Sequence, residues 1–101
     1  MQRQNKREGK RIKNFASAWD ILLYPLLTEK SMNMIEKENK LVFIVNKKAS
    51  KKDIKEAIEK EFEVKVEDVK TEITMKGQKK AFIKISPEFS ATDLASKLGM
   101  I

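Results

Sequence analysis

The sequence has no cysteine and no histidine among its 101 residues. Their absence excludes disulfides, thiol nucleophiles, imidazole bases and the usual zinc sites. A metal held by carboxylates alone would still be possible, but no spacing typical of a calcium-binding loop occurs. The chain has only 3 glycines, and because they are isolated no glycine-rich phosphate loop can form. We therefore expect no catalytic residues, no metal and no cofactor.

Positive charge is what the sequence has in excess. It holds 22 Lys+Arg against 15 Asp+Glu, for a formal net charge of +7. Such an excess indicates an acidic partner, either nucleic acid or an anionic membrane. Most of it lies in the first 13 residues, on Arg3, Lys6, Arg7, Lys10, Arg11 and Lys13. This stretch has too few apolar residues to bury surface, so we expect a basic N-terminal arm over 1–14 and a single domain over 15–101.

The arm has two interpretations, as does the apolar stretch that follows it. The arm is either a solvated tail or a segment that orders on phosphates, and the lysine clusters described below favour the second. A basic start followed by the apolar residues 15–27 resembles a signal peptide. However, Asp20 and Pro25 interrupt the stretch, no small-residue cleavage site follows, and it is too short to span a bilayer. We therefore expect a cytoplasmic protein, consistent with the absence of cysteine.

The first half of the domain predicts a turn, a strand, a helix and a second strand. Residues 15–19 predict a helical turn, and Ile21–Tyr24 predicts a short strand that Pro25 ends, which suggests an edge position. A helix capped by Thr28 should run to 38–39, where it frays. The continuous apolar run 41–45 predicts a central strand that is covered on both faces.

The second half predicts two helices and a hairpin. Ser50 caps the clearest helix, 51–62, with Asp53 in its first turn. Alternating residues in 68–75 and 80–86, separated by the turn 76–79, predict a β-hairpin whose apolar face ends at Met75. Ser90 caps a last short helix that ends at Gly99. The expected fold is α+β, in the order β-α-β-α-β-β-α, with a mostly antiparallel four-stranded sheet and helices packed on it.

The candidate binding residues are lysines in loops and at helix starts, where ammonium groups can reach phosphates. They are Lys30, Lys47, Lys48, Lys51, Lys52, Lys76, Lys79 and Lys80. A single lysine is usually solvated, but these groups, together with the positive end of helix 51–62, favour a nucleic-acid backbone. Lysine reads base edges less well than arginine, so we expect recognition of backbone and shape. No basic amphipathic helix occurs, and so we expect no direct membrane binding.

Phe82 is the one aromatic side chain placed between lysines on a predicted strand. Stacking on an RNA base is conceivable for it, but packing beneath a helix on a two-sided sheet is the favoured interpretation. No ribonucleoprotein motif typical of an RNA-recognition domain is present.

Several motifs, in order, resemble the universal large-subunit ribosomal protein twenty-three family over residues 20–101. Residues 24–31 (YPLLTEKS) resemble its Pro-x-x-Ser/Thr-Glu-Lys opening, and residues 39–43 resemble its asparagine-led central strand. Residues 49–64 resemble its Ala-x-Lys-x-x-Ile helix with the Phe-Glu-Val close. Residues 79–85 resemble its late Lys-Lys-Ala-aromatic-Ile-Lys strand, with Ile85 where leucine is usual.

Two departures indicate the type of member. Bacterial members have a long basic loop between the hairpin strands, whereas the connection here is short. The C-terminal residues 98–101 and the short arm resemble archaeal or eukaryotic members, with an archaeal source favoured.

The resemblance implies a structural constituent of the large ribosomal subunit that binds its rRNA beside the exit of the polypeptide tunnel. It also implies contacts with neighbouring ribosomal proteins and with exit-site factors such as the signal recognition particle. Glu29 matches the acidic residue that contacts a ribosome-bound chaperone in bacterial members, although a first-turn acid is also favoured by the helix dipole. The alternative is a protein-interaction adaptor that uses the apolar segment 15–27 or a sheet edge.

Overall fold

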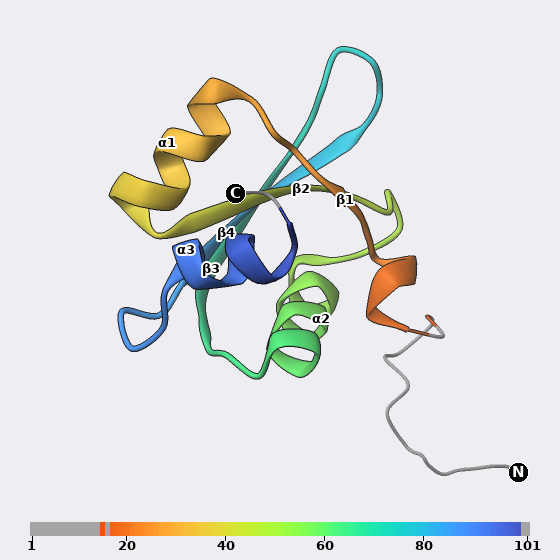
Figure 1. The fold of residues 1–101 in the computed structure, drawn as a ribbon. Helices are drawn as coiled ribbons and strands as arrows, with labels where there is room; N and C mark the ends of the chain where they lie inside the picture. The colour runs from red at the N-terminus through yellow and green to blue at the C-terminus, as the bar shows by residue number, and fades with distance from the viewer. Residues whose placement is uncertain (1–14, 16, 100–101) are drawn as a thin grey trace, which may run out of the picture.

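The computed structural model describes residues 15 and 17–99, in which helices separate all strands except the β3–β4 hairpin (Figure 1). The elements are η1 (Ala18–Asp20), β1 (Leu22–Pro25), α1 (Glu29–Glu38), β2 (Lys40–Val45), α2 (Lys51–Phe62), β3 (Val66–Ile73), β4 (Lys79–Ile85) and α3 (Ala91–Lys97). The strands form one sheet in the order β1-β2-β4-β3, and each neighbouring pair is antiparallel. This confirms the predicted α+β class and element order. The arm predicted over residues 1–14 lies outside the described residues.

The proline-ended strand β1 lies at the edge of the sheet, as its sequence predicted. Pro25 is its last residue, where a missing backbone N–H costs no hydrogen bond toward a further strand. The apolar strand β2 is central, between β1 and β4. It pairs with β4 over its whole length, from Lys40 opposite Lys84 to Val45 opposite Lys79.

The two long helices begin at reciprocal caps. Thr28 Oγ1 accepts a hydrogen bond from the Ser31 amide at 3.1 Å, and Ser31 Oγ accepts one from the Thr28 amide at 2.9 Å. Ser50 and Asp53 exchange the same pair of bonds at the start of α2, at 3.2 and 3.0 Å. Such bonds satisfy amides that a helix start leaves without partners. Both predicted caps are confirmed, while the part played by Ser31 was not foreseen.

All three helices pack on one face of the sheet. Alternate residues of the two central strands share one buried cluster with apolar residues of every helix: Leu41, Phe43, Val45, Ala81, Ile83, Ile85, Ile35, Ile54, Ile58 and Leu94. Figure 1 views the molecule from this side, with α3 in front of the strands. The helices and the helix-facing residues of β2 and β4 therefore form the main core.

The other face of the sheet carries no helix among the described residues, which corrects the expectation of a two-sided sheet. Val42 and Ile44 point to this face and lie outside the core cluster, yet they are only 2% and 3% exposed. Their β4 partners, Phe82 and Lys80, stand directly opposite them on the same face. Neighbouring side chains can therefore bury a central strand as fully as a helix does, and the apolar run could not tell the two apart. Phe82 does not lie beneath a helix.

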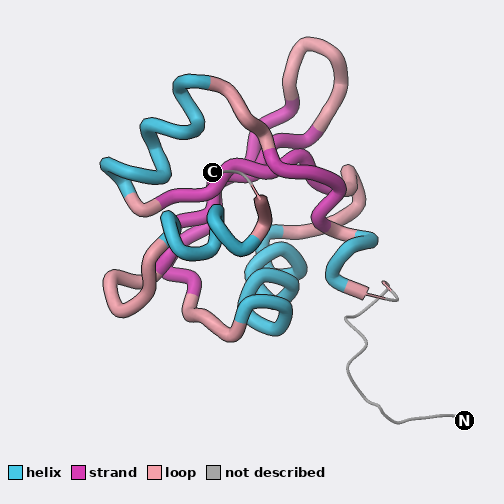
Figure 2. The backbone as a smooth tube through the Cα atoms, viewed as in Figure 1, coloured by secondary structure: helices cyan, strands magenta, loops and turns pink. Residues whose placement is uncertain are grey.

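The hairpin is confirmed, but its strands and turn differ from the prediction by up to two residues. The strands run over 66–73 and 79–85, and the turn between them covers 74–78. The Thr74 hydroxyl accepts a hydrogen bond from the Gln78 amide at 3.2 Å. This bond closes a turn that begins two residues before the predicted one. Met75 therefore lies in the turn and is fully exposed, and Ile73 is 63% exposed, so the predicted apolar face ends sooner. Figure 2 shows the turn as the pink loop that projects past the helices.

An aromatic contact holds one end of the described chain, and a helix cap followed by a glycine defines the other. The first helical turn, η1, packs on α2, where the ring of Trp19 meets that of Phe62 edge to face with 6.1 Å between centroids. At the other end, the Ser90 hydroxyl caps α3, and Gly99 follows it with a φ of +77°. The Ser90 cap and the glycine at 99 were predicted; the helical turn was expected over 15–19 and lies at Ala18–Asp20, and its contact with α2 was not foreseen.

Candidate nucleic-acid interface

One end of the sheet gathers lysines from two separate loops. Strand β2 ends there and leads through the loop 46–50 into α2, while the hairpin turn 74–78 leads into β4 at the same end, because Val45 pairs with Lys79. We call this region the basic end and define it by six side chains: Lys47, Lys48, Lys51, Lys52, Lys76 and Lys79. Two of the predicted lysine groups thus become neighbours in space.

Two contacts join the loop 46–50 to the hairpin turn. The Lys47 Nζ atom lies 3.5 Å from the position that a Cβ atom on Gly77 would take. The Lys79 ammonium donates a hydrogen bond to the backbone carbonyl of Ala49. Gly77 has a φ of +82°, a conformation that glycine adopts without strain. Glycine therefore suits the backbone of this turn, and the Lys47 side chain lies next to Gly77, which directly follows Lys76 in the sequence.

Asn46 gives the lysine loop a defined shape. Its Oδ1 atom accepts a hydrogen bond from the Lys48 amide at 2.9 Å, and its backbone carbonyl accepts one from the Ala49 amide at 3.0 Å. The Asn46 amide in turn donates to the carbonyl of Ile21. Ala49 is buried, whereas Lys47 and Lys48 are exposed. Asparagine is a common turn residue, but the part that Asn46 plays here was not predicted from the sequence.

The start of α2 adds two more exposed lysines and the positive end of a helix dipole. Lys51 and Lys52 are the first two residues of α2, directly after the Ser50 cap. Amides in the first turn of a helix carry partial positive charge and attract anions. This helix start and the lysines beside it therefore form one region that favours negative charge.

Ion pairs divide the lysines into two groups. Across residues 15 and 17–99, the ion pairs join Lys40 to Glu38, Lys65 to Glu88, Lys80 to Glu72 and Lys84 to Glu67, at 3.2 to 4.0 Å. Within that part of the chain, five exposed lysines of the basic end take part in no ion pair: Lys47, Lys48, Lys51, Lys52 and Lys76. Lys79 and Lys80, both predicted to bind, are instead half-buried and contact other groups of the protein.

The remaining predicted residues lie elsewhere. Glu29 and Lys30 are the first two residues of α1, and both are exposed. Figure 1 shows that α1 begins well away from the loop between β2 and α2, so Lys30 does not join the basic end. Arg3, Lys6, Arg7, Lys10, Arg11 and Lys13 lie outside the described residues.

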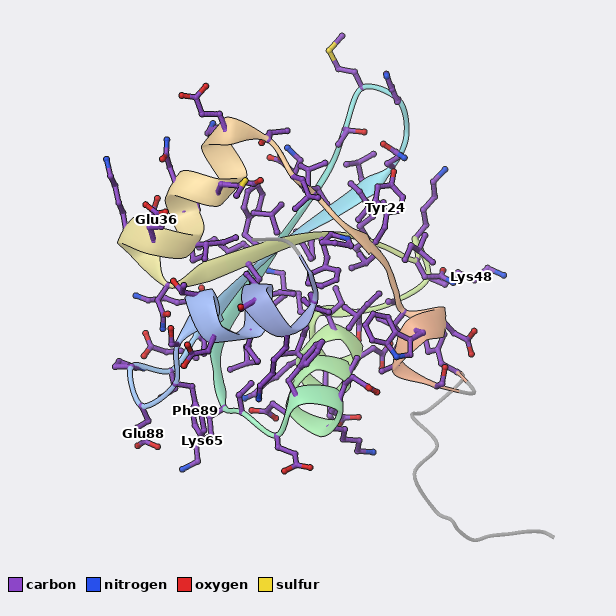
Figure 3. The ribbon with its side chains drawn as sticks, in the orientation of Figure 1. Tyr24, Glu36, Lys48, Lys65, Glu88 and Phe89 are labelled. Atoms are coloured by element: carbon purple, nitrogen blue, oxygen red, sulfur yellow. The ribbon has the colours of Figure 1, made fainter. Side chains whose placement is uncertain are left out.

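Acidic side chains gather at the opposite end of the sheet. They lie in or next to the last turns of α1 and α2, the start of β3, the end of β4 and the start of α3. These residues are Glu36, Glu38, Glu61, Glu63, Glu67, Asp68, Glu88 and Asp93. Figure 3 shows Glu36 and Glu88 on the other side of the molecule from Lys48. Three of the four ion-paired lysines also lie at this end, where they neutralise part of its negative charge.

The apolar segment 15–27 is largely used by the protein's own core. Phe15, Ala18, Ile21 and Leu22 are buried in the main cluster, whereas Leu23, Tyr24 and Leu27 are about half exposed. Trp19 of η1 is also 46% exposed, so a partner could reach Trp19, the outer side of β1 and the residues just after it. In the described part of the chain, no helix is long and apolar enough to cross a membrane.

Comparison with known proteins identifies a family. The sequence model described as "Ribosomal protein L23" matches residues 20–92. Two curated relatives, both named "Large ribosomal subunit protein uL23", come from Methanococcus aeolicus and Methanococcus vannielii and are 48% and 51% identical to this chain. Each alignment spans 83 residues, which is 82% of this chain and 96% of the relative. Both relatives are archaeal, in keeping with the type expected from the short hairpin and the C-terminal residues.

Proposed function

Since the chain belongs to the ribosomal protein L23 family and is therefore a structural protein of the large ribosomal subunit, we propose that it binds rRNA there through its basic end. Membership of this family also makes it a cytoplasmic protein and not an enzyme. The proposal concerns which surface meets the rRNA and which other factors the protein contacts.

The observation that carries the proposal is the meeting of the loop 46–50 with the hairpin turn. The Lys47 ammonium stands 3.5 Å from the Cβ position of Gly77, and so cations from both segments share one surface. Phosphates along RNA present closely spaced negative charges, and each lysine that neutralises one of them releases a bound counterion. Lys30 and the arm, with Arg3, Lys6, Arg7, Lys10, Arg11 and Lys13, provide further phosphate contacts in this proposal.

A salt titration of rRNA binding tests the basic end. The full chain is titrated with deproteinised large-subunit rRNA at increasing KCl concentration, and the slope of log affinity against log salt is measured. Replacing Lys47, Lys48, Lys51 and Lys52 together by glutamine should make this slope shallower by about 3, since each phosphate contact contributes roughly 0.7–0.9. Affinity at low salt should fall with it.

A second variant with the same change of charge is the control. Lys37, Lys60, Lys65 and Lys97 are exposed lysines in other parts of the domain, and three of them lie in the last turns of helices. Replacing these four by glutamine should leave the slope within about 1 of the wild-type value, because few phosphate contacts would be lost. Equal slopes for the two variants would show that net charge, and not the basic end, determines binding.

We also propose that the protein lies beside the tunnel exit and that exit-site factors, including the signal recognition particle, contact the start of α1. The support for this is the match of residues 24–31 to the family's opening motif, together with the exposure of Glu29 at the first position of α1. The acidic end of the sheet stays free of phosphates in this arrangement and is available to neighbouring ribosomal proteins.

A unique cysteine can test this contact, because the chain has none of its own. A Glu29→Cys variant carrying a photo-crosslinker should crosslink to the signal recognition particle on large subunits. A Glu88→Cys variant provides an equally exposed control at the far end of the sheet. Crosslinking from position 29 that is no stronger than that from position 88 would contradict this contact.

A further inference from the structure

The helix-free face of the sheet carries an aromatic ring at its centre. Phe82 is the fourth of the seven residues of β4, a central strand, and its side chain points away from the helices. Its partners in the two neighbouring strands are Val42 in β2 and Lys70 in β3. Val42 is almost fully buried although no described helix covers it, and the half-buried ring of Phe82 stands directly opposite it on the same face.

Three lysines stand close to this ring on the same face, together with Asp68 and Glu72 of β3. Lys80 and Lys84 are two residues before and after Phe82 on the same strand, and therefore on the same face, while the exposed Lys70 stands beside it on β3. The Lys80 ammonium lies over the ring, 5.5 Å from its centroid. The face of the ring thus already attracts a cation, and it is open enough for one to lie on it.

The interactions that hold these lysines in place are weak. Lys80 pairs with Glu72 at 3.6 Å and Lys84 with Glu67 at 3.3 Å, and both acids are about half exposed. Exposed ion pairs contribute little to stability, so the ammonium groups can move toward a phosphate at small cost. Along its own strand, the nearest charged neighbours of the ring are the cations Lys80 and Lys84, whereas Glu67 and Glu72 belong to the outer strand β3.

We propose that an unpaired RNA nucleotide stacks its base on Phe82 while Lys70 and Lys80 contact the adjoining phosphates. Every base has a π face, so a single aromatic ring can hold an unpaired base without reading its sequence. Lys80 pairs with Ile44 and Lys79 with Val45, so the stacking site lies on the opposite face from Lys79 but near the same end of the strands as the basic end. This inference rests on the proposed rRNA binding and adds a contact that involves a base.

Substitutions at Phe82 separate stacking from charge. Phe82→Leu keeps an apolar cover over Val42 but removes the π face, and it should lower affinity for deproteinised large-subunit rRNA roughly tenfold. The slope with salt should not change, since no cation is removed. Phe82→Trp should keep wild-type affinity within about twofold. Phe89→Leu, a change at a half-buried aromatic residue at the acidic end, is the control for general loosening and should bind as wild type does.

Ultraviolet crosslinking of the wild-type complex locates the contact. After trypsin and nuclease digestion, a nucleotide adduct is expected on the peptide 81–84, which contains Phe82. No adduct there, with unchanged affinity of Phe82→Leu and a steep salt slope, would overturn the stacking site and leave the proposed function standing. A protein crosslinked to this peptide in whole large subunits would also overturn it. Salt-independent affinity of the wild-type chain would contradict both proposals.

Discussion

At the scale of single residues, two side chains end helices in the left-handed backbone conformation. Asn39 follows α1 with a φ of +56°, and Glu63 follows α2 with a φ of +54°. This conformation is strained for residues other than glycine, although asparagine tolerates it better than most. The two positions share a backbone geometry and differ in what the side chain does.

Asn39 connects three segments of the protein. Its Nδ2 atom donates to the carbonyls of Ile85 and Phe89 at 2.9 and 3.1 Å, and its Oδ1 atom accepts from the Ala91 amide at 2.7 Å. The end of α1 is thereby joined to the end of β4 and the start of α3. The sequence placed a fraying helix end here, but hydrogen bonds to residues about fifty positions away are invisible in a local pattern.

Glycine substitutions should therefore act in opposite directions at these two positions. Glu63→Gly relieves backbone strain at an exposed side chain and should raise the free energy of unfolding by about 0.5–1 kcal/mol. Asn39→Gly relieves less strain and leaves buried backbone groups without partners, so it should lower this free energy by about 2–4 kcal/mol. Urea unfolding followed by the fluorescence of Trp19, the sole tryptophan, measures both.

Two other results would contradict these expected changes in stability. If both substitutions stabilise the protein, the hydrogen bonds of Asn39 contribute little and its role is only to adopt the left-handed conformation. If both destabilise it, the loss of chain entropy on ordering glycine outweighs the relief of strain at Glu63.

At the scale of elements, the sequence was most informative where a local signal determines the structure. The caps at Thr28, Ser50 and Ser90 fixed the starts of three helices, because the capping oxygen and the amide it satisfies are three residues apart. Pro25 correctly indicated an edge strand. These features depend on neighbours in the chain and not on the packing of the whole domain.

The faces of the sheet could not be predicted in the same way. An apolar run such as 41–45 shows that a strand is buried, but it does not show what buries it. Here β4 side chains cover Val42 and Ile44, and this leaves Phe82 on a face without a helix. The register irregularity between Val66 and Asp68 likewise brings Val66 and Val69, three residues apart, into the same core. Neither effect has a signature in the alternation of single residues.

The candidate site was predicted in part. The lysines of 47–52 and 76–79 were singled out from their positions in loops and at a helix start, but the sequence could not show that the two loops meet. It also could not distinguish Lys80, which lies beside Glu72 and Phe82, from Lys47 and Lys76. A lysine's partners across a sheet follow from register, which becomes known only with the fold.

At the scale of the whole molecule, charge is distributed unevenly along the strands. The basic end combines exposed lysines of two loops with the start of α2, while the other end mixes acids with lysines, some of them ion-paired. This distribution favours the approach of a polyanion to the basic end, where the exposed lysines take part in no ion pair within the described part of the chain. A protein with a small net charge outside its arm can therefore still bind RNA with one particular side.

The central claim is that this basic end holds the protein on the rRNA of the large subunit, and a salt wash of assembled subunits tests it most directly. Large subunits carrying the wild-type chain, the glutamine variant at 47, 48, 51 and 52, or the matched variant at 37, 60, 65 and 97 are washed with increasing KCl and sedimented. We predict that the first variant leaves the subunit at clearly lower salt than the wild-type chain, whereas the matched variant leaves with the wild type. Release of both variants at the same salt concentration would contradict the claim.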